Sequence, residues 1–301
     1  MTDVVIVGSM ALDSIETPFG KVEDALGGSA TYASFAASFF CKPGIVAVIG
    51  SDFPEGHLKL LEKRSISLDG VITEKGKKTF RWKGSYEFAM NEARTLDTQL
   101  NVLELFKPKL PESYRKARYV LLGNIDPELQ LDVLSQVEKP RLVAADTMNF
   151  WIEHKREKVK EVIRKVDLLL INDAEARELF GTSNLLRAAM SALELGTKAV
   201  IIKKGEHGAL LFTQSAHFNA PGYPLENIFD PTGCGDCFAG ALVGYLAKTD
   251  DISQNSIRKA IIYGSSVASH NAEGFSLDVL KKISIKEIEK RFCEFREMRE
   301  F

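Results

Sequence analysis

The chain has 301 residues, of which 45% are hydrophobic, 27% are charged and 9% are aromatic. These ordinary proportions exclude disordered, collagen-like and low-complexity proteins, and the length is sufficient to bury a sizeable core. The 39 basic and 41 acidic residues leave a formal net charge of −2, so the charge gives no reason to expect a nucleic acid or an anionic membrane as partner.

Short apolar runs recur along the chain, and helical patterns lie between them. Six runs are typical of buried parallel strands: Val4–Gly8, Ile45–Ile49, Tyr119–Leu122, Leu142–Ala145, Leu168–Ile171 and Ala199–Ile202. Apolar stripes at helical spacing lie at 159–166 and 238–246, and an amphipathic terminal helix is expected from Ser284. Strands that alternate with helices predict an α/β fold with a mostly parallel central sheet covered on both faces.

Two regions interrupt this alternation. Residues 14–25 contain Pro18 and Gly20 in a hairpin-like turn, and residues 72–100 are polar and aromatic with two glycines. Both are expected to form strand pairs outside the main sheet. Because no internal repeat or flexible linker is present, we expect one domain over 1–301 with a small β insertion.

The segment Asp230–Gly240 is the most informative part of the chain. Gly233 and Gly235 stand where an apolar-striped helix begins, which leaves backbone N–H groups open to an anion. Asp236 lies in the first turn of that helix, where a carboxylate commonly serves as a cap. A carboxylate beside an anion-binding loop is better explained if it accepts a proton from a hydroxyl during phosphoryl transfer.

This segment resembles the C-terminal signature of the ribokinase (PfkB) family of carbohydrate and nucleoside kinases. The resemblance spans most of the chain and implies a three-layer α/β/α sandwich with a small β-strand lid. It also implies that Asp236 is the catalytic base and that the amides of Gly233, Cys234 and Gly235 form an anion hole. Cys234 stands where the family usually has alanine.

The residues that the resemblance places near the acceptor substrate lie close to the N-terminus. Gly27 and Gly28 match the family's glycine pair. Asp13 is expected at the end of the first strand and matches the carboxylate that holds sugar hydroxyls. Tyr32 stands where the family often has Asn, and Ala11 also replaces an Asn, which makes ribose itself a doubtful acceptor. Tyr32, with Phe80 and Trp82, either stacks on a nucleobase or packs the insertion onto the core.

The residues that the resemblance places near the nucleotide are spread over the second half of the chain. Asn172 and Glu175 match an Asn-x-x-Glu motif that implies Mg²⁺, held mostly through water. Four further residues are expected beside ATP: Lys203, Gly205, Thr232 and Gly264. Asp146, Asn149 and Trp151 fall in the order of another family stretch.

The expected activity is ATP- and Mg²⁺-dependent phosphorylation of a hydroxyl on a small sugar or sugar-like substrate. A nucleoside kinase with an adenosine-, inosine- or cytidine-like acceptor is the alternative, and a non-catalytic sugar- or nucleotide-binding protein is a further one. A homodimer through the lid is plausible. Neither the acceptor nor the phosphorylated position follows from the sequence.

Other motifs argue against competing classes of protein. Cys234 and Cys237 form a lone C-x-x-C without histidines at ligand spacing, which disfavours redox or zinc chemistry. No Walker motif occurs, and no G-x-G-x-x-G follows the first strand, which disfavours P-loop enzymes and nicotinamide-dependent dehydrogenases. Four scattered cysteines, no signal-peptide pattern and no bilayer-length apolar stretch predict a cytoplasmic protein.

Overall fold

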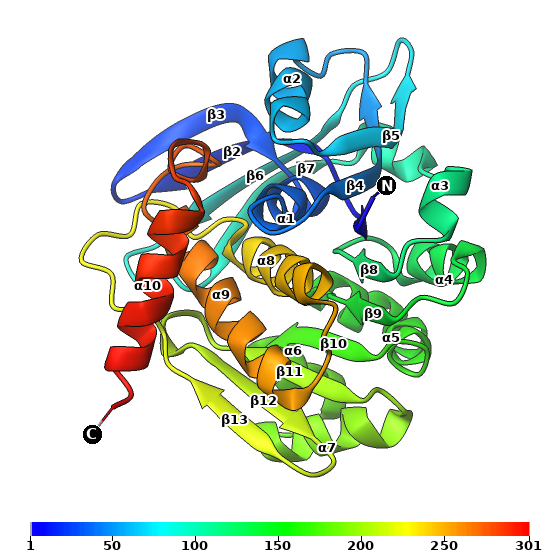
Figure 1. Ribbon diagram of the computed structural model, residues 1–301. Coiled ribbons are helices and arrows are strands. Elements are labelled where there is room, and N and C mark those ends of the chain that lie inside the picture. The colour runs from blue at the N-terminus through cyan, green and yellow to red at the C-terminus, as the bar shows by residue number, and fades with distance from the viewer. Residues whose placement is uncertain (1, 301) are drawn as a thin grey trace.

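The computed structural model describes residues 2–300, and a nine-stranded sheet runs through its middle (Figure 1). The strand order is β13-β12-β11-β10-β9-β8-β1-β4-β5, in which β5 through β11 are parallel and β12 and β13 are antiparallel. The strands are β1 (Val4–Val7), β4 (Pro43–Gly50), β5 (Ser67–Glu74), β8 (Tyr119–Leu122), β9 (Leu142–Ala145), β10 (Leu168–Asn172), β11 (Ala199–Lys203), β12 (Ala209–Thr213) and β13 (His217–Ala220). All six predicted strands are confirmed.

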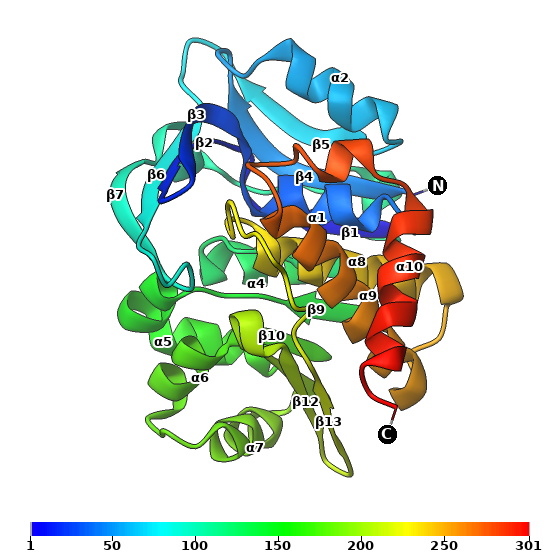
Figure 2. The same cartoon turned by 90° about the vertical axis from the view of Figure 1, so that its left-hand side faces the viewer.

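Helices cover both faces of this sheet (Figure 2). One face carries α1 (Ser29–Ala37), α2 (Glu55–Lys63), α8 (Cys234–Thr249), α9 (Gln254–Ala272) and α10 (Ile285–Glu297). The other carries α3 (Glu112–Arg115), α4 (Pro127–Gln136), α5 (Asn149–Ile163), α6 (Asp173–Phe180) and α7 (Leu185–Leu195). In β1, Val4 and Ile6 join the core of the first face, and Val5 and Val7 join that of the second. The uniformly apolar strand is therefore explained by burial on both sides.

A second, four-stranded sheet stands apart from the main one, and we call it the lid. Its order is β3-β2-β6-β7, with strands β2 (Ala11–Thr17), β3 (Gly20–Gly27), β6 (Phe80–Tyr86) and β7 (Ala93–Gln99). The predicted boundaries of 14–25 and 72–100 need correction, because β2 begins at Ala11, β3 ends at Gly27, and residues 72–74 belong to β5. Ile72 pairs with Val48 of β4 in the main sheet. Asp13 likewise lies within β2 and not at the end of the first strand.

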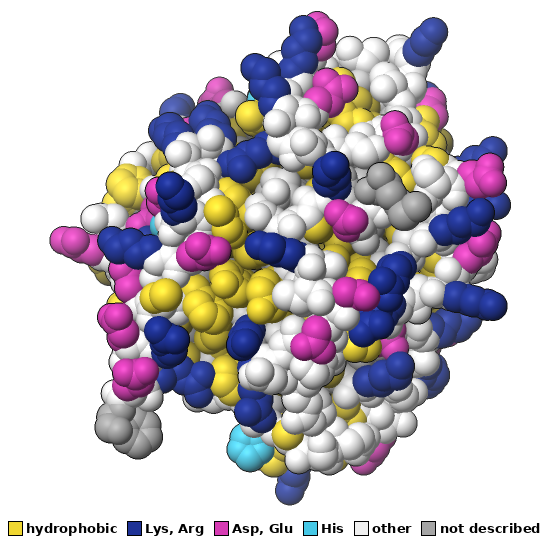
Figure 3. All heavy atoms as spheres, viewed as in Figure 1, with side chains coloured by type: hydrophobic (Ala, Val, Ile, Leu, Met, Phe, Trp, Pro, Cys, Tyr) yellow, Lys and Arg dark blue, Asp and Glu magenta, His cyan; other side chains and the backbone are white. Residues whose placement is uncertain are grey.

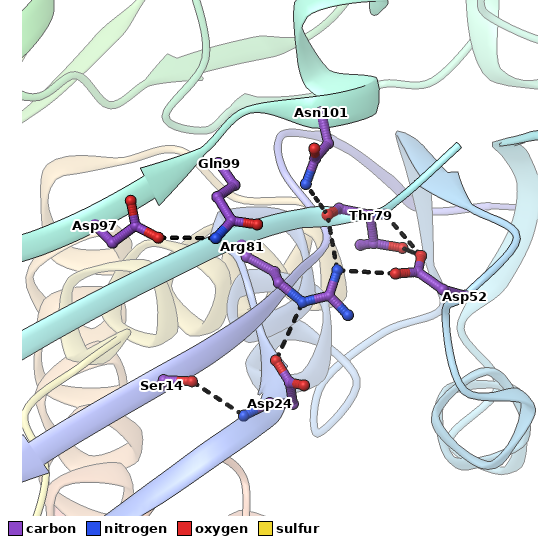
Figure 4. A network of polar contacts seen from close by, with 8 residues as sticks. All are labelled: Ser14, Asp24, Asp52, Thr79, Arg81, Asp97, Gln99 and Asn101. Atoms are coloured by element: carbon purple, nitrogen blue, oxygen red, sulfur yellow. Dashed lines mark hydrogen bonds and ion pairs between the residues drawn. The ribbon is translucent and has the colours of Figure 1, made fainter. Parts of the chain in front are cut away.

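A polar network fixes the lid to the main sheet where β6 begins (Figure 4). The buried Thr79 donates its backbone N–H and its hydroxyl to Asp52, each at 2.7 Å. Arg81 donates to the other Asp52 oxygen at 2.8 Å and to Asp24 of β3 at 3.2 Å. Asn101 donates to the Thr79 carbonyl at 2.9 Å. Asp52 follows β4, so this network sets the position of β6 relative to the main sheet.

Charged side chains of both signs interleave over the face shown in Figure 3, as the near-zero net charge leads one to expect. Within residues 2–300, no helix combines the length and apolar character needed to cross a membrane.

Candidate active site

The loop that begins α8 depends on glycine. Gly233 caps the helix in the left-handed region, with φ 74° and ψ 0°. A Cβ atom at this position would lie 2.4 Å from the ring of Tyr32 on α1. Both the backbone conformation and the contact exclude a side chain, so the loop can lie directly on α1 only because residue 233 is glycine.

The amides of this loop differ in their availability. Cys234 N donates to Pro231 O at 3.1 Å and closes a turn. Within residues 2–300, the amides of Gly233 and Gly235 have no hydrogen-bond partner. The predicted three-amide anion hole therefore needs correction at Cys234, whose N–H is already used. The two glycine amides and the positive end of the α8 dipole remain for an anion.

Three side chains hold the loop in place, one from the loop itself and two from distant parts of the chain. Asp230, which is fully buried, accepts hydrogen bonds from Thr232 N at 2.9 Å and Ser276 N at 3.2 Å. Asn271 of α9 donates to Thr232 O at 2.8 Å. Tyr86, at the end of lid strand β6, lies 3.1 Å from the Thr232 hydroxyl. The lid and the loop are therefore in direct contact.

Asp236 lies in the first turn of α8 and is partly buried. Burial raises the pKa of its carboxyl from 3.8 to about 7, and the negative charge of Asp146 adds to the rise while Lys203 opposes it. A carboxylate that titrates near neutral pH is well matched to the removal of a proton from an alcohol. The raised pKa is compatible with the predicted role of Asp236 as a general base.

Asp13 faces the same region from lid strand β2. A Cβ atom at Gly27 would lie 1.9 Å from Asp13 Oδ2, so the carboxylate occupies the space that a side chain would need. Gly28, which has φ 95°, would place a Cβ atom 2.5 Å from Ser9 O. Burial raises the pKa of Asp13 to about 7, a Gly28 backbone hydrogen bond opposes this, and Asp230 and Asp236 add to it. Gly27 therefore makes room for the buried carboxylate, and Gly28 makes room for the backbone of Ser9.

The carboxyl edge of the parallel strands brings a third group of ionisable side chains together. Lys203 ends β11 in register with Asn172, which ends β10, and Asp146 follows β9. Lys203 Nζ lies 2.5 Å from Asp146 Oδ2. Burial raises the pKa of Glu175 to about 8 against the opposing charge of Lys203, and Asp146 adds to the rise. In open parallel sheets this edge is where ligands bind.

Asn172 and Glu175 form a capping box at the start of α6. Asn172 Oδ1 accepts from Glu175 N at 2.7 Å, and Glu175 Oε2 accepts from Asn172 N at 2.9 Å. No group of three acidic, histidine or cysteine side chains in residues 2–300 is arranged to hold a metal ion directly. One oxygen of Glu175 has no hydrogen-bond partner among the described residues, so the pair fits an ion that is carried on phosphates and reached through water.

The remaining predicted residues lie in different surroundings. Gly205 is exposed at the bend after β11, and a Cβ atom there would lie 3.0 Å from Asn91 Oδ1 at the tip of the lid. Gly264 is buried in the contact between α9 and α8, where a Cβ atom would meet Phe238 O at 2.8 Å. This close contact between the helices explains why residue 264 has no side chain.

The aromatic residues of the acceptor side pack within the protein. Tyr32 is 1% exposed against Gly233, so in this structure its ring is covered by protein and not open to a ligand. Trp82 packs over Gly84, and its indole N–H donates to Thr95 Oγ1 at 3.2 Å. Phe80 is partly buried at the start of β6. These placements fit the packing alternative for Tyr32 and Trp82.

Three residues of the site were given no role in the sequence analysis. Asp146 was noted only as part of a family stretch, although it follows a predicted strand just as Asn172 and Lys203 end theirs. Tyr86 and Asn271 carry no local signal, because each reaches Thr232 from a distant part of the chain.

Comparison with known proteins shows which family this chain belongs to. The model of the pfkB family of carbohydrate kinases matches residues 1–278. A cytidine kinase from Thermococcus kodakarensis is 30% identical over 254 residues, which cover 81% of this chain and 89% of that protein.

Solved structures share the fold at low sequence identity. A putative ribokinase II from E. coli, in complex with ATP and Mg²⁺, has a TM-score of 0.81 at 16% identity and covers 98% of this chain and 100% of its own. A nucleoside kinase from Burkholderia thailandensis in complex with inosine has a TM-score of 0.80 at 17% identity and covers 96% of each chain. The match to the family model over most of the chain, together with the relative at 30% identity, shows that this protein is a kinase of the pfkB family.

Proposed function

We propose that the protein transfers the γ-phosphoryl group of ATP to a hydroxyl of a nucleoside. The observation that carries this proposal is the meeting of Asp236, the two free glycine amides and Asp13 at one place. A proton acceptor, an anion site and a buried carboxylate for substrate hydroxyls are the parts that phosphoryl transfer to an alcohol requires.

In the proposed reaction, Asp13 accepts hydrogen bonds from the acceptor and orients it. Asp236 takes the proton of the reacting hydroxyl as its oxygen attacks the γ-phosphorus. The bond from that phosphorus to the β–γ bridging oxygen breaks, and ADP leaves with the electron pair. The amides of Gly233 and Gly235 hold the phosphoryl oxygens throughout.

The acidic surroundings make a cation necessary for the nucleotide. Mg²⁺ would supply positive charge to the phosphates, and Glu175 would hold it through water from the first turn of α6. The protein's own contribution is the fixed position of Glu175 in its capping box.

One comparison favours a nucleoside over a free sugar, since the cytidine kinase is similar over four fifths of this chain. Ala11 and Tyr32 count only against ribose itself, because both stand where the family often has Asn. A free sugar is the second candidate, because the family model describes carbohydrate kinases.

An ADP-release screen over pentoses, hexoses, sugar phosphates and nucleosides tests the proposal, with Asp236→Asn as the blank. We expect ADP release with a nucleoside, at a rate that the blank lowers by about a hundredfold or more. Release with a hexose or pentose alone would establish the sugar alternative. Binding of sugars or nucleosides without ADP release would establish the non-catalytic alternative.

The homodimer through the lid is also a proposal. All seven residues of β7 are exposed, and β7 is an edge strand of the lid. An exposed edge with unpaired backbone groups is suited to pairing with a second copy. Light scattering after size exclusion should give twice the chain mass, and Thr95→Pro, which places proline in the edge strand, should return it to one chain mass.

A further inference from the structure

We propose that Lys203 is a further catalytic residue, which contacts the transferred phosphoryl group, and that Asp146 is the positioning residue that holds its ammonium group beneath the α8 loop. This inference rests on the proposed function. It moves Lys203 from the adenosine end of the nucleotide, where the resemblance put it, to the reacting end.

The position of the ammonium group is the first argument. A Cβ atom built on Gly235 would meet Lys203 Nζ at 3.2 Å, and its three nearest neighbours would all be atoms of the Lys203 side chain. Gly235 carries one of the two free amides of the loop. An anion held by that amide would therefore lie next to the ammonium group of Lys203.

The charge of the surroundings is the second argument. Asp146 lies 2.5 Å from the ammonium group, and the charges of Glu175 and Asp236 also act on it. Among the described residues, Lys203 is the cation whose charge acts on both Asp236 and Glu175. A nucleotide tail with several negative charges can approach this group of acids only where positive charge offsets them, and Lys203 is the protein's own source of it.

Burial is the third argument. The side chain of Lys203 is 17% exposed and that of Asp146 is 6% exposed. Ion pairs this deeply buried are costly to desolvate, and apolar residues of similar volume often give an equally stable protein. A pair retained at the edge of the sheet, beside the proposed base, is better explained by function than by stability.

The pair also acts on the proposed base. The charged and titratable groups around Asp236 come from three other elements and from its own helix: Asp146 after β9, Lys203 of β11, Asp13 of β2, and Cys234 and Cys237 of α8. Burial and Asp146 raise the pKa of Asp236, and Lys203 lowers it. Neutralising Lys203 should therefore move the acid limb of kcat/KM to higher pH, and neutralising Asp146 should move it to lower pH.

The test compares Lys203→Met, Lys203→Arg and Asp146→Asn with wild type. Lys198→Met is the matched control, because Lys198 precedes the other end of β11 and pairs with Asp167 at the surface. We expect Lys203→Met to lower kcat by about a hundredfold or more, as loss of one transition-state donor does, with a much smaller change in the KM for ATP. We expect its acid limb to rise by about one pH unit, since nearby charges shift a pKa by about 1–3.

Binding gives a readout that needs no turnover. ADP with aluminium fluoride stands in for the phosphoryl group in transfer, and calorimetry compares its affinity with that of ADP alone. Lys203→Met should lose at least about tenfold in affinity for ADP with aluminium fluoride, while its affinity for ADP stays near wild type. Lys203→Arg should restore part of the loss, and Lys198→Met should resemble wild type in both assays.

The outcomes separate this inference from the proposed function. A wild-type protein that releases no ADP with any acceptor refutes the proposed function. An active wild type whose Lys203→Met variant keeps kcat within about threefold, with an unmoved acid limb, refutes the role of Lys203. If Lys203→Met does not fold, Lys203→Arg and Asp146→Asn decide: an Asp146→Asn acid limb that fails to move to lower pH would overturn the inference.

Discussion

The replacement of Asp236 by Asn tests the proposed base through activity and stability together. Asn keeps the shape of the side chain but cannot accept the proton of the acceptor hydroxyl. Turnover should fall by about a hundredfold or more, which is the usual contribution of a general base. The variant should still bind ATP, because the free amides of Gly233 and Gly235 are unchanged.

Stability should change in the opposite direction. The pKa of Asp236 is about 7 in the folded chain and 3.8 as an ordinary carboxyl. Proton binding by Asp236 therefore favours folding at low pH, and this contribution to the free energy of unfolding is lost as pH rises from 3.8 through 7. At about 1.36 kcal/mol per unit of pKa, the full penalty is at most about 4 kcal/mol above pH 8, of which solvent at this partly buried site screens a part. The free energy of unfolding of the Asn variant, relative to wild type, should therefore increase by up to about 3 kcal/mol between pH 5 and pH 8.5.

Urea denaturation at pH 5 and pH 8.5 measures this difference, with Asp132→Asn on the surface of α4 as the control. The difference in the free energy of unfolding between the control and wild type should be the same at both pH values. An Asp236→Asn variant that is inactive but gains nothing at pH 8.5 would refute the argument that burial tunes the base. A variant that keeps near wild-type turnover would remove Asp236 from the reaction altogether.

Three further changes test other parts of the site. Gly27→Ala places a Cβ atom 1.9 Å from Asp13 Oδ2, so kcat/KM for the acceptor should fall about a hundredfold, with the KM for ATP little changed in steady-state kinetics. Thr79→Val removes the hydroxyl bonded to Asp52 and Gly50 and should lower the free energy of unfolding by about 1–3 kcal/mol in urea, whereas Thr79→Ser should not. Removal of divalent ions with EDTA should abolish ADP release, and added Mg²⁺ should restore it; activity in EDTA would contradict the proposed role of the metal.

The fold followed from the sequence where strands are buried on both faces. The run at Val4–Val7 is apolar because each of its faces meets a core, and this signal is local. Strand β5 escaped prediction as part of the main sheet because it is an edge strand with only one fully buried residue. The lid boundaries were displaced for the same reason, since a partly exposed strand carries no continuous apolar run.

The site followed from the sequence where a motif fixes backbone geometry. Gly233 requires positive φ and Gly27 leaves room for Asp13, and both roles belong to glycine as a residue type. The use of the Cys234 amide by Pro231 O depends on the turn actually formed, which spacing alone does not determine. Tyr86 reaches Thr232 across 146 positions of sequence, a contact that only the folded chain reveals.

The same burial that raises the pKa of Asp236, the proposed base, also makes the ionised site costly in free energy. Asp13, Asp236 and Glu175 all have raised pKa values, mainly because burial disfavours their charged forms. Above neutral pH these carboxylates repel one another, and Lys203 offsets only part of their charge. A nucleotide that brings its own divalent cation relieves this repulsion, whereas a bare polyphosphate increases it. In the proposed reaction, this arrangement would favour a metal-bound nucleotide over the bare polyphosphate, and the charge of the ligand would shift the titration of Asp236.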